Sequence, residues 1–175
     1  SWMQWAAENG ITAGTSANTF SPDATCTRGQ VVTMLWRNAG KPEPETTQCR
    51  FTDVKSNTYC YKAILWAVEN NITGGYSDGT FRPKATCTRG QIVTFLYRAA
   101  GSPEPQSSYN PFFDIREGQY YYKAVLWAVE NGITTGTSAT TFAPEKTITR
   151  SQAVTFLWRN AGAPASEVEN PFTDV

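Results

Sequence analysis

One pattern of residues occurs three times in this chain, at a constant spacing of 61 residues. The positions that keep this spacing include Trp5, Trp66 and Trp127; Phe20, Phe81 and Phe142; and Arg28, Arg89 and Arg150. A fixed period of this length indicates a stack or ring of like modules, each too small to bury its own apolar face alone. A residue present in all three copies therefore serves a purpose that every module shares.

The composition excludes several classes of protein. The 175 residues include 15 basic and 15 acidic side chains, so no broad basic surface suggests nucleic acid as a partner. No apolar run approaches the roughly 20 residues of a membrane span, so we expect no membrane insertion. Histidine is absent, which rules out a Ser-His or Cys-His nucleophile and argues against an ordinary zinc site. We therefore expect that the chain binds no cofactor and no metal and is not an enzyme.

The second copy shows the organisation of one module. It opens with Phe-Thr-Asp-Val at 51–54, and apolar residues at helical spacing predict an amphipathic helix over 59–70. A loop rich in turn residues covers 72–83. A second helix is predicted to start at Thr88, because Thr88 and Gln91 have the spacing of a capping box, and to end near Gly101. The repeat thus predicts an all-α fold of three helix-loop-helix modules with pseudo-threefold symmetry.

The three modules are expected to form one compact domain, because a single helix pair cannot hide its apolar face from water. The first module covers residues 1–49 and lacks the opening motif. The second covers 50–110. The third covers 111–175 and ends with an extra opening motif at 172–175.

The four cysteines fall into two kinds. Cys26 and Cys87 are equivalent, and the third copy has Ile148 there, which predicts a buried apolar site, with a bridge between the two only if the modules meet there. Cys49 and Cys60 occur only in the second module. Their joint presence predicts a disulfide that closes a short loop, and hence an oxidising compartment.

The repeated arginines are the best candidates for binding. Arg28, Arg89 and Arg150 fall at the first position of the second helix, where a cation opposes the helix dipole and asks for a compensating anion. One candidate is internal, because Asp53, Asp114 and Asp174 follow in the next opening motif and could form an Arg–Asp bridge. The other is an external carboxylate or phosphate, held by the guanidinium together with free helix N–H groups. Both interpretations stay open at this point.

The repeated tryptophans have two interpretations as well. Aromatic rings can stack on sugar faces. Aromatic residues at helical spacing are more often part of a core, and we predict that role for Trp5, Trp66 and Trp127. No module contains a pair of carboxylates suited to glycoside hydrolysis, which argues against a cell-wall hydrolase.

Taken together, these motifs resemble a known family. Phe-Thr-Asp-Val, Trp-Ala-x-Glu-Asn-x-Ile-Thr-x-Gly, Phe-x-Pro and Thr-Arg-x-Gln follow one another in the pattern of the S-layer homology (SLH) module, over almost the whole chain. The resemblance implies a pseudo-trimeric three-helix prism. It also implies non-covalent anchoring of an exported protein to the bacterial cell wall, through an anionic secondary polysaccharide that often carries a pyruvyl ketal. The chain would then be extracellular, at the cell surface, and part of a larger surface protein.

The resemblance also implies which residues bind the polysaccharide. They are the arginines Arg28, Arg89 and Arg150, the aspartates Asp53 and Asp114, the loop glycines Gly14, Gly75 and Gly136, and the glutamines Gln30, Gln91 and Gln152.

The chain departs from the family pattern at three places. The glutamines stand where the family has glutamate, Gly29, Gly90 and Ser151 stand where it has alanine, and Cys26 and Cys87 stand where it has isoleucine. Glutamine keeps the capping box and removes a negative charge beside the arginine. These departures also motivate an alternative function, a protein-interaction or assembly module at the cell surface that has lost sugar binding.

Overall fold

The computed structural model describes all residues 1–175 and contains six α-helices and no strand, which confirms the predicted all-α class. The helices are α1 (Trp2–Glu8), α2 (Arg28–Asn38), α3 (Tyr61–Glu69), α4 (Arg89–Ala99), α5 (Tyr122–Glu130) and α6 (Arg150–Asn160). None of them has the length and apolar content needed to cross a lipid bilayer.

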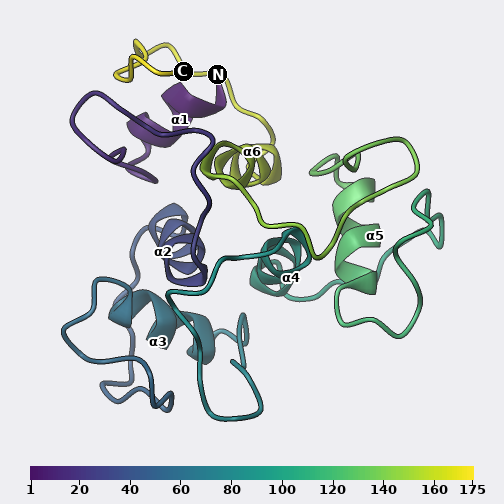
Figure 1. Ribbon diagram of the computed structural model, residues 1–175, viewed down its shortest axis with the longest axis horizontal. Helices are drawn as coiled ribbons and strands as arrows, with labels where there is room; N and C mark the ends of the chain where they lie inside the picture. The colour runs from purple at the N-terminus through teal and green to yellow at the C-terminus, as the bar shows by residue number, and fades with distance from the viewer.

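The helices form a three-lobed ring (Figure 1). Helices α2, α4 and α6 surround the centre, and α3, α5 and α1 lie outside them, packed on α2, α4 and α6 respectively. Each lobe therefore joins the second helix of one module to the first helix of the next. The first helix of the chain closes the ring, because α1 packs on α6.

The boundaries of the central helices follow from local chemistry. Thr27, Thr88 and Thr149 are the N-caps of α2, α4 and α6, and each forms a complete capping box with the glutamine three residues later. This confirms the helix starts predicted from the sequence. Asn70 ends α3, where its side chain donates to the carbonyl oxygen of Trp66 at 2.8 Å.

The three modules meet at the centre of the ring through backbone hydrogen bonds. The amide of Cys87 donates to the carbonyl of Cys26 at 2.8 Å, that of Ile148 to Cys87 at 2.9 Å, and that of Cys26 to Ile148 at 3.0 Å. All three side chains are fully buried, as predicted for this position. The cyclic arrangement satisfies the backbone of each module only in the presence of the other two.

The opening motifs pack on the loops of the modules. Phe51 lies 5.6 Å from Phe81 between ring centroids, and Phe112 lies 5.7 Å from Phe142. In the first module this place is filled by the last motif of the chain, since Phe172 lies 5.7 Å from Phe20. The extra motif at 172–175 thus does for the first module what residues 51–54 do for the second.

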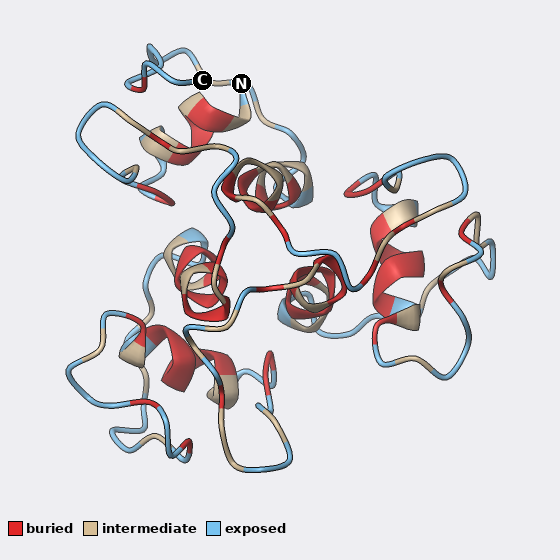
Figure 2. Ribbon diagram, viewed as in Figure 1, coloured by how far each residue is buried: buried red, intermediate tan, exposed pale blue.

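A single hydrophobic core runs through all three lobes. Figure 2 shows buried residues on the central helices, over the middle of the outer ones and in short segments of the loops. Trp5, Trp66 and Trp127 are buried within this core, which confirms the structural interpretation of the repeated tryptophans. They are not available as platforms for a sugar.

Candidate functional site

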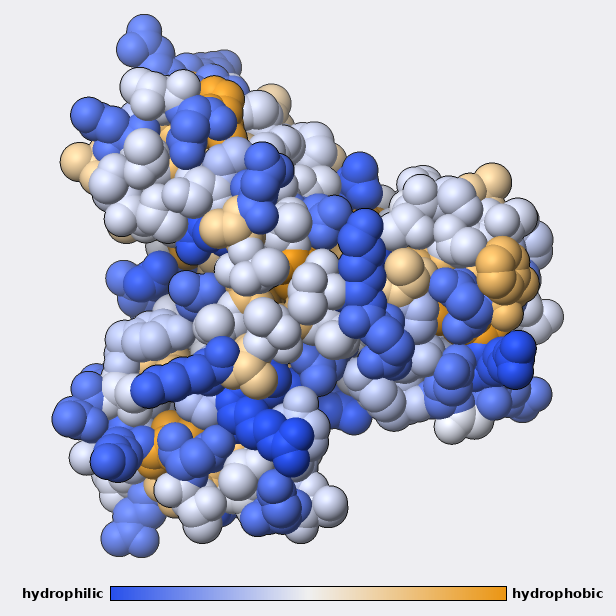
Figure 3. Space-filling model, in the orientation of Figure 1, coloured by the Kyte–Doolittle hydropathy of each residue, from blue (hydrophilic) through white to orange (hydrophobic).

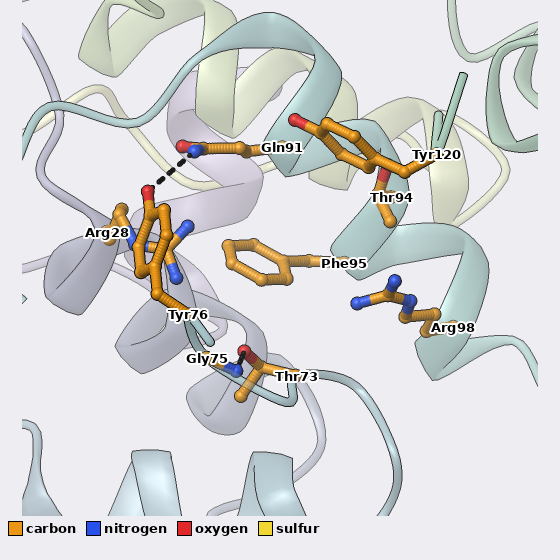
Figure 4. Close-up of a pocket in the computed structure, with 9 residues that line it drawn as sticks. All are labelled: Arg28, Thr73, Gly75, Tyr76, Gln91, Thr94, Phe95, Arg98 and Tyr120. Carbon is orange, nitrogen blue, oxygen red and sulfur yellow. Dashed lines mark hydrogen bonds between the residues drawn. The ribbon is translucent and has the colours of Figure 1, made fainter. Parts of the chain in front are cut away.

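The first candidate site is a groove on the face of α4 (Figure 4). Its cavity has a volume of about 270 Å³. It is lined by Arg28, Thr73, Gly75, Tyr76, Gln91, Thr94, Phe95, Arg98 and Tyr120. The α4 residues lie at i, i+3, i+4 and i+7 and so share one helix face, while Arg28 comes from the preceding module. We call this cavity the Arg28 groove.

A second groove has the same construction one module later and a volume of about 490 Å³. It is lined by Trp2, Arg89, Thr134, Gly136, Thr137, Lys146, Ser151, Gln152, Thr155, Phe156 and Arg159. We call it the Arg89 groove. Neither groove has an acidic residue in its lining, although the chain as a whole has no net charge. Both grooves therefore present an environment that favours an anion.

The repeated arginines lie at the base of this arrangement. Arg28 is 5% exposed, and its Nε atom donates to the carbonyl oxygen of Phe81 at 2.9 Å. Its terminal nitrogens have no hydrogen-bond partner within the chain. Every fully buried side-chain nitrogen does have a partner, so these two nitrogens are not fully buried and are accessible from the groove. Arg89 is held in the same way, with Nε donating to Phe142 at 2.8 Å.

The surroundings of these arginines lower their pKa. Burial lowers the pKa of Arg28, Arg89 and Arg150, and the charge of Asp114 partly opposes this effect at Arg89. Arginine nevertheless stays protonated at neutral pH. No carboxylate lies within ion-pair distance of any of the three. The grooves thus hold buried positive charges without an internal counter-ion.

The Arg–Asp bridge, one of the two alternatives that the sequence leaves open, is not formed. The carboxylate of Asp53 instead accepts hydrogen bonds from the backbone amides of Phe81 and Arg82, at 2.9 and 2.7 Å. Asp114 makes the same contacts with Phe142 and Ala143. These aspartates hold the phenylalanine loop in place, and the structure does not bring them into either groove.

The expectation that the helix starts offer free N–H groups is also wrong. The amide of Arg28 donates to Ala85 at 2.9 Å, and the amide of Gly29 donates to Pro83 at 3.0 Å. The capping box occupies the amides of Thr27 and Gln30. The same contacts occur at α4 and α6. The helix N-termini are therefore used to join the modules, and a ligand must be held by side chains.

The third arginine makes one more hydrogen bond than the other two. Arg150 donates Nε to the carbonyl of Phe20 at 2.8 Å and Nη2 to the hydroxyl of Thr12 at 3.3 Å. Met34 stands where the other grooves have Phe95 and Phe156. The site around Arg150 therefore keeps the arginine–carbonyl bond of the other two sites but has different side chains around it.

Three segments of the chain match the family model of the S-layer homology domain: residues 3–32, 50–93 and 111–154. Together these segments cover more than half of the chain. The chain belongs to the S-layer homology family. The resemblance found in the motifs is thereby confirmed.

Curated relatives agree with this family. The chain is 28% identical over 163 residues to a cellulosome-anchoring protein of Acetivibrio thermocellus, and 33% identical over 165 residues to an endoglucanase of Bacillus sp. strain KSM-635. It is 36% identical over 103 residues to a surface-layer 125 kDa protein of Lysinibacillus sphaericus. The matches cover 89%, 88% and 59% of this chain but only 36%, 17% and 9% of those proteins. These relationships place the SLH chain among cell-surface anchoring modules.

The structure explains why the loop positions of the SLH motif require glycine. Gly75 lines the Arg28 groove with φ of +70°, and a Cβ atom there would overlap the ring of Phe51. Gly136 occupies the same place in the Arg89 groove, against Phe112. Only glycine lets the loop pass this close to the opening motif. The backbone of the loop then forms one wall of the groove.

The glutamines at the third helical position have two functions. The Oε1 atom of Gln91 accepts from the amide of Thr88 in the capping box, and its Nε2 atom donates to the hydroxyl of Tyr76 at 3.1 Å. Gln152 caps α6 in the same way and lines the Arg89 groove. Glutamine therefore presents a neutral donor where the family has a carboxylate.

Sequence reasoning missed a second arginine in each groove. Arg98 and Arg159 line the Arg28 and Arg89 grooves, and Nη1 of each donates to a loop carbonyl, that of Ile72 or Ile133. Thr94 and Phe95 were missed as well. The signal was present, because the arginine and the threonine recur in all three modules and the phenylalanine in two, and all of them lie on one helix face with Gln91.

All four cysteines are free thiols in the structure. Cys60 is fully buried and Cys49 is half-buried against the core. The predicted bridge between Cys49 and Cys60 therefore stays a prediction, which peptide mapping without reductant would test. The modules do meet at Cys26 and Cys87, whose thiols are also free.

Proposed function

We propose that this SLH chain anchors an exported protein to the bacterial cell wall by binding an anionic secondary polysaccharide, one that carries a pyruvyl ketal or a similar acidic group. The observation that carries the proposal is the pair of grooves that each contain two arginines and no acid. A buried guanidinium with free terminal nitrogens suits a carboxylate, because its planar fork can donate two parallel hydrogen bonds.

The other lining residues suit a sugar. Thr73 and Thr94 provide hydroxyl groups in the Arg28 groove, and Phe95 and Tyr120 provide aromatic surface. Sugars offer hydroxyl groups at their edges and C–H groups on their faces, so a lining of this mixture matches them on both counts. The Arg89 groove has the same mixture with Thr134, Thr155, Phe156 and Trp2.

Two grooves on one rigid ring would add their contributions on a repeating polymer. Binding of a second repeat unit becomes intramolecular once the first is held, which raises the overall affinity without new contacts. This suits a non-covalent anchor, which must hold a large protein on a surface.

Arg98 and Arg159 allow a test that spares the fold, because they are only half-buried and the buried arginines also hold the phenylalanine loops. The double variant Arg98→Gln with Arg159→Gln is expected to lower retention on purified wall sacculi at least tenfold, with an unchanged melting temperature. The double variant Arg116→Gln with Lys55→Gln is the matched control, since both residues are exposed, lie outside both grooves and together lose the same two charges.

The wall provides a second arm of the test. Sacculi from which the acidic groups have been removed should retain the wild-type chain poorly, and added salt should weaken retention on untreated sacculi. Unchanged retention of the double variant, or equal retention on both kinds of sacculi, would refute the proposal.

One observation favours the alternative of an assembly module. Phe113 and Tyr109 are 70% and 68% exposed, and the equivalent residues 61 positions earlier are Thr52 and Gln48. On the face of the molecule that Figure 3 shows, hydrophobic residues form separate spots rather than one broad patch. A surface of this kind gives the alternative less support than the grooves give to sugar binding. Crosslinking to a protein partner, together with no retention on sacculi, would favour it instead.

A further inference from the structure

The two grooves differ most at one position of the loop wall. Tyr76 lines the Arg28 groove, while the equivalent residue is Thr137 in the Arg89 groove and Thr15 in the first module. The tyrosine is therefore the exception among three copies of one loop.

Three side chains hold Tyr76 in place. Its hydroxyl accepts from Nε2 of Gln91 at 3.1 Å, across the groove from the loop that carries the ring (Figure 4). The guanidinium of Arg28 lies 4.7 Å from the centre of its ring, and that of Arg82 lies 3.9 Å from it. The ring is thus a fixed wall beside Arg28, with its aromatic face already engaged by cations.

The corresponding part of the Arg89 groove is open. The hydroxyl of Thr137 bonds within its own loop, to the carbonyl and hydroxyl of Thr141 at 3.2 and 3.0 Å. It leaves Nε2 of Gln152 without a partner in the chain. The guanidinium of Arg89 lies 4.8 Å from the ring centre of Phe142, as that of Arg28 lies 4.6 Å from Phe81, but no second ring of this loop lies over Arg89 as Tyr76 lies over Arg28. The volumes agree with this difference, at about 490 Å³ for the Arg89 groove and about 270 Å³ for the Arg28 groove.

We propose that Tyr76 is a specificity-determining residue that makes the two grooves unequal, so that the Arg89 groove is the high-affinity site for the acidic sugar. This inference rests on the function proposed above. A sugar that enters the Arg28 groove must compete with the tyrosine for Arg28 and for the amide of Gln91. In the Arg89 groove the equivalent donors are free to bind the sugar directly.

An exchange of the two loop residues tests the proposal. Backbone amide shifts of Gly75 and Gly136 report the Arg28 and Arg89 grooves separately in NMR titrations, with short fragments of purified acidic wall polysaccharide as the probe. The wild-type chain should show a dissociation constant about tenfold lower at Gly136 than at Gly75. Tyr76→Thr should strengthen binding at Gly75 about tenfold and leave Gly136 unchanged.

The reverse variant provides the matched control. Thr137→Tyr should weaken binding at Gly136 about tenfold and leave Gly75 unchanged. Tyr76→Phe keeps the ring and removes the bond to Gln91, so it should give a smaller gain than Tyr76→Thr. Agreement of these variants would support a role in the groove rather than a general effect on folding.

The outcomes separate the two proposals. Binding at both glycines that does not respond to the exchange, or that weakens in Tyr76→Thr, would overturn the role of Tyr76 and leave the proposed function standing. Absence of any shift at both glycines in the wild-type chain would overturn the proposed function, and the role of Tyr76 with it.

Discussion

The Nε hydrogen of Arg28 is donated to the carbonyl oxygen of Phe81, which lies 53 residues later in the chain, with 2.9 Å between nitrogen and oxygen. Arg89 makes the same bond to Phe142, and Arg150 makes it to Phe20. Each arginine therefore joins its own module to the next, and in Arg28 and Arg89 the terminal nitrogens remain directed at a groove. The same side chain serves folding with one end of its guanidinium and a ligand with the other.

Replacement of Arg89 by alanine is expected to destabilise the fold. The buried carbonyl of Phe142 would lose its partner, which costs about 1–3 kcal/mol of the free energy of unfolding. Urea denaturation of Arg89→Ala and of Arg98→Gln measures the difference, and Arg98→Gln should change stability by less than about 0.5 kcal/mol. Equal stability of wild type and Arg89→Ala would show that the bond contributes nothing to folding.

Replacement of Phe172 by alanine is expected to loosen the first module. This ring is 6% exposed and packs on Phe20, so its loss should cost about 3–5 kcal/mol. Phe113→Ala removes the same side chain from a position that is 70% exposed, and it should change stability by less than about 0.5 kcal/mol. Thermal unfolding of both variants compares them, and similar melting temperatures would contradict the role given to residues 172–175.

Acid should weaken the contact between Asp174 and the loop at Phe20. Hydrogen bonds from the amides of Phe20 and Ser21 hold the pKa of Asp174 below its ordinary value, which is near 3.9. The carboxylate therefore stabilises the folded state fully above about pH 4 and loses this effect as the pH falls through the lower folded-state pKa. Asp174→Asn should be less stable at neutral pH and should lose less stability between pH 4 and pH 2 than wild type. Parallel acid denaturation curves would contradict this.

The central thiols should be unreactive in the folded chain. Burial raises the pKa of Cys26 to about 11 and that of Cys87 to about 12, and both side chains are inaccessible. Because the thiolate is the reactive form, iodoacetamide at pH 8 should leave both unmodified until urea is added. Mass spectrometry of the alkylated peptides measures this, and rapid modification of Cys87 without urea would mean that the ring opens in solution.

Most of the fold could be predicted because its signals are local. A threonine and a glutamine three residues apart define the start of α4, and the apolar spacing over 59–70 defines α3 to within two residues at each end. The period of 61 then supplies the other two modules. The repeat does not say which helices pack together, and the structure pairs α3 with α2 of the preceding module rather than with α4.

The site was only partly predictable, because its key contacts lie between modules. The sequence indicates an uncompensated cation at Arg28, but it does not show that the carbonyl of Ala85 reaches the helix start and takes the free amide. The sequence places Asp53 in the opening motif that follows Arg28, which allows an ion pair between them. The carboxylate of Asp53 instead accepts hydrogen bonds from the amides of Phe81 and Arg82. Long-range backbone contacts of this kind leave no pattern in a single sequence.

The way the central helices are shared limits what a shorter piece of this ring could do. The Arg28 groove takes its arginine from the first module, most of its wall from the second and Tyr120 from the third. The Arg89 groove takes its arginine from the second module, most of its wall from the third and Trp2 from the first. A fragment of two consecutive modules would therefore lack part of the lining of either groove, and a lone module could assemble none. The binding sites lie where modules meet, so the number of complete grooves would fall faster than the number of modules as repeats are removed.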